Sequence, residues 1–290
     1  MLWLLDGALQ FQPYMFSKAF FADLLSMANM GLPGPLSTAI FSVTSMLTAH
    51  PVAWNAVFAT LQVALGTGLL WGRTAWLARP ASIAWALGVW IVGEGLGGMF
   101  MPGISALNGA PGAALLYALA AVMLWPRRSG DGTAAADAGL LGAGGARWCW
   151  AALWAGLAAL ELGSANHAPV VPAAEVADIG EGEPAWLAGL NHHAGQLLAG
   201  RGAAFALAAG LAELLIALGI LRSRWRRTAL GAGIALALVY GVFGQDLGGL
   251  LTGQATDPGT APLLVLLALA LWSQRPPRHP ATSHTERPTT

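Results

Sequence analysis

Long apolar stretches constrain this chain more than any other feature. A helix needs about 20 mostly apolar residues to cross the hydrocarbon core of a bilayer. Six stretches come close to or reach this length, at 52–71, 80–99, 109–126, 147–164, 203–221 and 228–250. Two weaker candidates are 1–20, which carries Asp6, and the shorter 258–273. The sequence therefore predicts an all-α, polytopic transmembrane helix bundle of about eight spans.

The composition indicates that the main partner of the chain is a lipid bilayer. Charged residues make up 10% of the 290 residues, whereas a soluble domain carries about 25%. The formal net charge is zero, so we expect no nucleic-acid partner. The single cysteine, Cys149, excludes an internal disulfide, a CxxC redox pair and a cysteine-based zinc site. The N-terminus has no basic region or small-residue cleavage site, so we expect no signal peptide.

Basic residues lie at alternate ends of the predicted spans. Twelve of them fall on one side if both termini lie on that side: Arg73, Arg79, Arg127, Arg128, Arg147, Arg222, Arg224, Arg226, Arg227, Arg275, Arg278 and Arg287. Only Lys18 and Arg201 fall on the other. Cytoplasmic loops carry an excess of lysine and arginine. We therefore expect a multi-pass protein of a bacterial-type cell membrane with both termini cytoplasmic.

The chain repeats itself with an offset of 151 residues. GEGLGG at 93–98 recurs as GQDLGG at 244–249, and Arg73 matches Arg224. The same register pairs Ala110-Pro111 with Ala261-Pro262. Each half would hold four spans, an even number, so the halves should share one orientation. The predicted units are a first repeat at 1–126, a cytoplasmic Gly/Ala linker at 127–146, a second repeat at 147–273 and a disordered cytoplasmic tail at 274–290.

The second half resembles the DoxX-like integral membrane protein superfamily. WAALWAGLAALELG at 150–163 is similar to the first helix of that family. LAELLIALGILRSRWRRTALGAGIAL at 211–236 is similar to its second and third helices, with a glutamate in mid-helix and an arginine-rich turn. The first half has the same skeleton, with Gln62 in place of Glu213. The resemblance implies tandem four-helix bundles and an association with quinone-linked or thiol-stress redox systems.

Glu213 is predicted to lie within the membrane, in the middle of its span. Ionisable groups at that depth cost about 2.5–3.5 kcal/mol on insertion scales, so they are candidates for function. The structural alternative is a helix–helix hydrogen bond, for which the expected partner is Gln62 of the other half.

The two GxxLGG turns are the second candidate site. Glu94 and the pair Gln245-Asp246 each precede Leu-Gly-Gly, and irregular segments that contain Asn108 and Asp257 follow. Irregular backbone at membrane depth is tolerated where it is buried in protein or lines a cavity. We therefore expect Glu94 and Asp246 to share an outward-facing polar cavity, to which Asn108 and Asp257 add polar groups. The alternative is that the acidic residues cap helices.

Two surface segments read as interfacial helices, and the histidines and methionines give no metal signature. Apolar residues recur at helical spacing over 17–31, and 174–200 is its acidic counterpart.

Histidine and methionine side chains gather in the outer segments, but no tight MxxM or HxxxH spacing occurs. We therefore expect no metal site.

Three functions remain open at this stage. The resemblance favours an accessory or quinone-associated component of a membrane redox system. Its partners would be other redox subunits of the membrane, and its cofactor would be a quinone. The duplicated bundle with paired broken segments is also typical of a transporter or channel for an ion or small solute. An enzyme has the least support, because no nucleophile–base pair, phosphate loop or metal signature is present; no catalytic residue is predicted.

Overall fold

The computed structural model describes residues 1–29, 31–126, 134–177 and 182–272 as a helical protein with no β-strand among them. Four helical segments are long and apolar enough to cross a membrane. They are α4 (Pro51–Leu70), α5 (Ala75–Gly88) continued by the π-helical η2 (Val89–Gly93), α10 (Gly202–Gly219) and α11 (Arg226–Phe243). At 1.5 Å per residue each has about the thickness of the hydrocarbon core. Only 22% to 39% of their residues are buried inside the protein, so their apolar side chains face outward.

The other predicted spans differ in length. Helix α7 (Gly142–Glu161) has 20 residues, whereas α6 (Ala113–Met123) has 11 and α12 (Thr260–Leu271) has 12. The two short helices follow the irregular segments 99–112 and 250–259.

The predicted span over 1–20 is not a continuous helix. Helix α1 (Leu2–Leu9) ends after eight residues, the 3-10 helix η1 (Pro13–Phe16) follows, and α2 (Lys18–Asn29) begins a new direction. Pro13 is the first residue of η1, and a proline cannot donate the backbone hydrogen bond that would continue α1.

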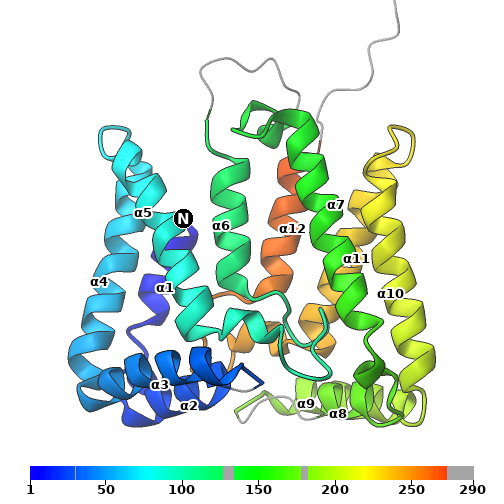
Figure 1. The fold of residues 1–290 in the computed structure, drawn as a ribbon, viewed down its shortest axis with the longest axis horizontal. Coiled ribbons are helices and arrows are strands. Elements are labelled where there is room, and N and C mark those ends of the chain that lie inside the picture. Colours follow the sequence, from blue (N-terminus) through cyan, green and yellow to red (C-terminus); the bar gives the residue numbers. More distant parts are fainter. Residues whose placement is uncertain (30, 127–133, 178–181, 273–290) are drawn as a thin grey trace, which may run out of the picture.

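Figure 1 shows the same order of packing in the two halves of the chain. Helix α4 contacts α1 and α5, and α10 contacts α7 and α11 in the corresponding way. Helices α6 and α12 pack against each other in the centre and link the halves. The main hydrophobic core extends over several helices and includes large buried side chains such as Trp150, Trp154 and Leu116.

Shorter helices lie across the lower end of the bundle in Figure 1: α2, α3 (Gly34–Ala49), α8 (Val171–Ala177) and α9 (Ala185–Leu198). The predicted interfacial segments 17–31 and 174–200 form α2, α8 and α9 in this layer. A membrane boundary suits such helices because their apolar faces are covered there.

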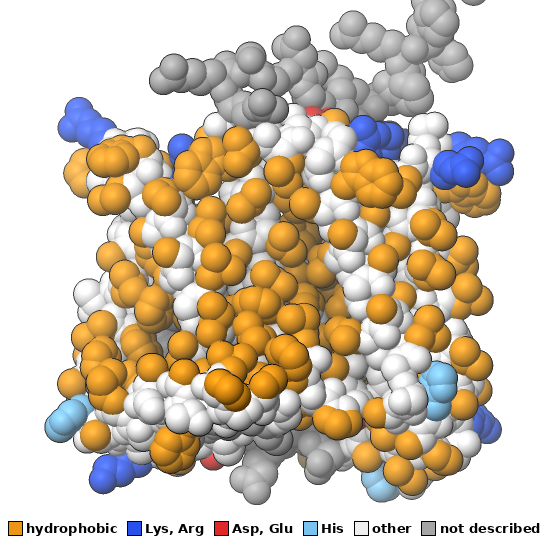
Figure 2. All heavy atoms as spheres, viewed as in Figure 1, with side chains coloured by type: hydrophobic (Ala, Val, Ile, Leu, Met, Phe, Trp, Pro, Cys, Tyr) orange, Lys and Arg blue, Asp and Glu red, His pale blue; other side chains and the backbone are white. Residues whose placement is uncertain are grey.

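Basic side chains gather at the upper end. The turns 71–74 and 220–225, which carry Arg73, Arg222 and Arg224, join the long helices there (Figure 1). Figure 2 shows hydrophobic side chains over the middle of this face, with lysine and arginine at its margins. Lys18 begins α2 and Arg201 precedes α10, both at the lower end. Arg127, Arg128, Arg275, Arg278 and Arg287 lie outside the described residues.

Small residues let the first helix of each half approach its neighbour. A Cβ atom on Gly66 of α4 would lie 2.6 Å from Leu4 Cγ of α1. In the second half, a Cβ atom on Gly210 of α10 would lie 2.7 Å from Leu162 Cγ, directly after α7. Close approach of this kind is how helices associate in lipid, where water does not drive them together.

Candidate functional site

The two GxxLGG turns cap the helices that follow them. Glu94 Oε1 accepts the backbone N–H of Ala114, the second residue of α6, at 2.9 Å. Gln245 Oε1 accepts the N–H of Ala261, the second residue of α12, at 3.0 Å, and the Thr260 hydroxyl at 2.7 Å. These N–H groups have no partner within their own helices. The capping role considered for the acidic residues is therefore present at Glu94, and an amide performs it in the second half.

Both turns use left-handed backbone. Gly95, Leu96 and Gly97 have φ of 52°, 62° and 64°, and Asp246, Leu247 and Gly248 have φ of 47°, 50° and 71°. The 3-10 helices η3 (Leu96–Gly98) and η6 (Asp246–Gly249) lie at these positions.

A proline-glycine pair packs against each turn. A Cβ atom on Gly97 would lie 1.9 Å from the carbonyl oxygen of Pro111, and one on Gly248 would lie 2.4 Å from that of Pro258. Pro111-Gly112 therefore corresponds in space to Pro258-Gly259. The matching of Ala110-Pro111 with Ala261-Pro262 is wrong, because the second irregular segment is four residues shorter and Pro262 lies inside α12.

The irregular segments cross between the halves. Asn108 Nδ2 donates to Glu175 Oε1 of α8 at 2.9 Å. In the opposite direction, Gln12 Nε2 donates to the carbonyl oxygen of Ala255 at 2.9 Å. Each half therefore forms hydrogen bonds with the irregular segment of the other half. The order of residues along the sequence does not predict these contacts.

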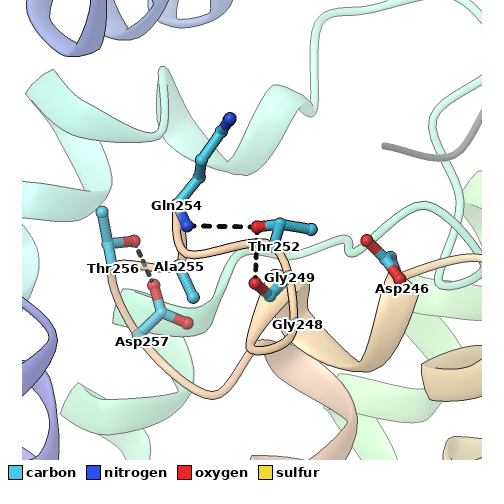
Figure 3. A pocket seen from close by; sticks show the side chains of 8 residues that line it. All are labelled: Asp246, Gly248, Gly249, Thr252, Gln254, Ala255, Thr256 and Asp257. Atoms are coloured by element: carbon cyan, nitrogen blue, oxygen red, sulfur yellow. Dashed lines mark hydrogen bonds between the residues drawn. The ribbon is translucent and has the colours of Figure 1, made fainter. Parts of the chain in front are cut away.

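An open cavity of about 290 Å³ lies beside the second turn (Figure 3). Its lining runs from Asp246 to Asp257 and includes Thr252 and Thr256. Asp257 Oδ1 accepts the N–H of Gly259 at 2.8 Å, and its Oδ2 accepts the Thr256 hydroxyl at 2.8 Å. Burial raises the pKa of Asp257.

Asp246 and Glu94 have different surroundings. Asp246 is 5% exposed, lines the cavity, and its Oδ1 has no hydrogen-bond partner among the described residues. Glu94 does not line this cavity; it lies against Gly112 at the start of α6. Burial, followed by the charge of Asp257, raises the pKa of Glu94 to about 8. The expected cavity shared by Glu94 and Asp246 stays a prediction.

Glu213 is buried, and its hydrogen-bond partner is Tyr240. The Tyr240 hydroxyl donates to Glu213 Oε1 at 2.8 Å, across the α10–α11 contact. The expected bond to Gln62 is not formed: Gln62 is 7% exposed in α4, and its Oε1 has no partner among the described residues. The two residues lie in helices at opposite sides of the molecule (Figure 1).

Further polar groups in the bundle were not predicted as site residues. Tyr117 of α6 donates to Asp6 Oδ1 at 2.7 Å. Glu161, the last residue of α7, is 2% exposed, forms a side-chain hydrogen bond with Ser105 and interacts electrostatically with Glu213. The signal that could have found Asp6 and Glu161 is the one that found Glu213: a carboxyl group in an apolar stretch.

In the part of the chain that the structure describes, no group of three or more histidine, cysteine, aspartate or glutamate side chains could hold a metal ion. Cys149 is a free, half-buried thiol.

Over the described residues the protein is all-helical, with four helices long and apolar enough to cross a membrane and with carboxyl groups buried among the helices. No family model, no curated protein and no solved structure matches the chain. The resemblance to the DoxX-like superfamily therefore stays a prediction.

Proposed function

We propose that this chain is an integral membrane transporter that couples proton binding to the movement of an ion or small solute. The observation that carries the proposal is the pair Glu161 and Glu213, 2% and 0% exposed, at the contact between α7 and α10. The Oε2 atom of each has no hydrogen-bond partner among the described residues.

Such a pair is suited to exchange a proton. The Tyr240 hydroxyl that donates to Glu213 Oε1 is neutral, so it is not a cationic partner for the carboxylate. Two charged carboxylates close together in a low-dielectric site repel each other strongly, and a bound proton or cation removes that repulsion. Buried ionisable groups of this kind mark proton relays in pumps and transporters.

The architecture that we propose is two parallel four-helix repeats. It is supported by the matching order of helix packing, by the two capped turns at one end and by the basic turns at the other. The excess of arginine at the upper end favours a cytoplasmic location for that end and for both termini, in a bacterial-type cell membrane. Broken segments at corresponding places in two halves are a pointer to a transport site.

Charge movement after a pH jump tests the proposal without knowledge of the substrate. The purified chain is reconstituted into liposomes, the proteoliposomes are adsorbed on a capacitive sensor, and the pH is stepped from mildly alkaline to mildly acidic. The wild-type protein should give a transient current, and Glu213→Gln should reduce it to less than half of the wild-type level.

Asp23→Asn is the matched control, because Asp23 is an exposed carboxylate of α2 outside the bundle interior, and it should leave the current unchanged. Wild-type protein without a current, or Glu213→Gln with a wild-type current, would overturn the proposal.

A redox accessory role with quinone is the second candidate. The resemblance implies a helix pair over 211–236 joined by an arginine-rich turn, and α10 and α11 pack as such a pair. Quinone added to the purified protein in nanodiscs should quench tryptophan fluorescence saturably if this role holds. Quenching identical to that of nanodiscs with an unrelated tryptophan-containing helix protein would reject it.

A further inference from the structure

We infer that Asp246, Glu183 and Asn191 form a Ca²⁺-type cation site at the lower end of the second half. Glu183 directly precedes Pro184 and α9, Asn191 lies within α9, and Asp246 begins η6. The site therefore lies between an interfacial helix and the turn that caps α12. It is separate from the Glu161–Glu213 pair and does not rest on the proposed transport function.

The three side chains meet directly. The carboxyl groups of Glu183 and Asp246 lie within hydrogen-bond reach of each other. Asn191 Nδ2 donates to Glu183 Oε1 at 3.3 Å, so the Asn191 side chain borders the same cluster.

Asn191 Oδ1 has no hydrogen-bond partner among the described residues, and Asp246 Oδ1 and Glu183 Oε2 receive no N–H or hydroxyl donor there, since the two carboxyl groups face each other. Asp246 and Asn191 are 5% and 2% exposed, so their oxygens cannot be satisfied by bulk water. A buried polar atom without a partner costs about 1–3 kcal/mol. No lysine or arginine pairs with Glu183 or Asp246 in the described part of the chain.

The chemistry of the set favours calcium over other cations. All the donors are carboxylate or amide oxygens, the ligands that hard cations prefer. Ca²⁺ accepts irregular geometry and completes its shell with carbonyl oxygens and water, whereas Mg²⁺ demands a near-ideal octahedron. Asp246 also lines the cavity in Figure 3. A Cβ atom on Gly182 would lie 3.5 Å from Thr252, so the segment before Glu183 packs on the cavity wall.

The backbone conformation at Asp246 indicates that its side chain has a role other than forming the turn. Its φ of 47° lies in the left-handed region, where glycine is favoured, and the matching residue of the first half is Gly95. The cap on α12 comes from Gln245, so the Asp246 carboxylate is not needed for it. A carboxylate kept at a glycine position, buried and unpartnered, is what a ligand role requires.

Calcium-dependent stability of the purified full chain in detergent tests the site. After removal of divalent ions with EGTA, CaCl₂ should raise the Tm of the wild-type protein saturably, because a ligand that binds only the folded state stabilises it. Asp246→Gly and Glu183→Gln should lose the calcium-dependent rise. Asp246→Gly should not lower the Tm in EGTA, because glycine fits this turn in the first half. Asp23→Asn, which removes an exposed carboxylate elsewhere, should keep the rise.

Terbium luminescence gives a second readout that does not depend on stability. Tb³⁺ replaces Ca²⁺ at oxygen sites, and Trp186, three residues after Glu183, can sensitise it. Luminescence that calcium displaces, and that Asp246→Gly and Trp186→Phe abolish, would support the site. A wild-type Tm that does not respond to calcium, or a rise that persists in both Asp246→Gly and Glu183→Gln, would overturn it.

Discussion

The turns at 93–98 and 244–249 have the same backbone form and differ in where the carboxylate lies. In the first turn the acid is Glu94, and it caps α6. In the second turn the capping residue is the neutral Gln245, and the acidic residue is the next one in the sequence, Asp246. The comparison teaches that the cap needs an oxygen acceptor and not a charge.

The same comparison separates structural from functional acids. Glu94 has a backbone N–H to accept, so the fold accounts for its presence. Asp246 occupies a position where the first turn has Gly95, and its Oδ1 has no partner among the described residues. Of the two acids that the sequence pattern pairs, Glu94 caps a helix through Oε1 and Asp246 caps none, and one oxygen of each, Glu94 Oε2 and Asp246 Oδ1, has no hydrogen-bond partner among the described residues.

The largest effect is expected where both turns are tightest. Gly97→Ala and Gly248→Ala should each lower the free energy of unfolding by about 3 kcal/mol or more, from the left-handed backbone and the clash with a proline carbonyl together. Thermal unfolding in detergent measures this. Gly231→Ala is the control, because nothing lies within 4 Å of its added Cβ atom in α11. A tolerated alanine at one turn alone would show that the turns are not equivalent.

The caps should respond to loss of the acceptor and not to loss of the charge. Glu94→Ala leaves the N–H of Ala114 without its partner and should cost about 1–2 kcal/mol. Glu94→Gln keeps the acceptor, as Gln245 does, and should cost less than half as much. Equal losses in the two variants, measured by the same unfolding assay, would contradict the capping account.

The charge of Glu94 should appear in the pH dependence of stability. Its pKa is raised from 4.5 to about 8 in the folded protein, so the folded state binds the proton more tightly than the unfolded chain. The stability that this proton contributes is full below about pH 4.5 and is lost as the pH rises through about 8. The Tm of the wild-type protein relative to Glu94→Gln should therefore fall between these pH values. A constant difference between the two proteins would contradict the shift.

The smallest effect is expected at Asp246 in the absence of cations. Asp246→Gly gives the second turn the residue of the first and removes a buried carboxylate, so it should lower the free energy of unfolding by no more than about 0.5 kcal/mol. Unfolding in EGTA measures the change. A loss as large as that of Glu94→Ala would show that Asp246 supports the turn.

The sequence predicted the parts of the fold that depend on local pattern. The stretches 52–71 and 203–221 correspond closely to α4 and α10, because length and apolar character decide such helices. The predicted stretch 80–99 begins and ends too far along the chain, because α5 begins at Ala75 and η2 ends at Gly93.

What the sequence missed depends on contacts between distant residues. The Glu213–Tyr240 bond joins two helices whose rotation is set by packing, so Gln62 was the wrong partner. The crossing of the irregular segments, seen at Asn108 and Ala255, leaves no periodic trace in the sequence. The shift in register between the halves was hidden because Ala-Pro happens to recur at the constant offset.

The labelling of single cysteines tests the central claim, that the two halves cross the membrane in the same orientation. In a Cys149→Ala background, cysteines replace the exposed residues Gly72 and Ser223 in the upper turns and Met99 and Gln254 at the lower end. A membrane-impermeant reagent applied to intact cells should label the Met99 and Gln254 positions, and the Gly72 and Ser223 positions only after permeabilisation. Labelling of Gly72→Cys and Ser223→Cys from opposite sides would contradict the claim.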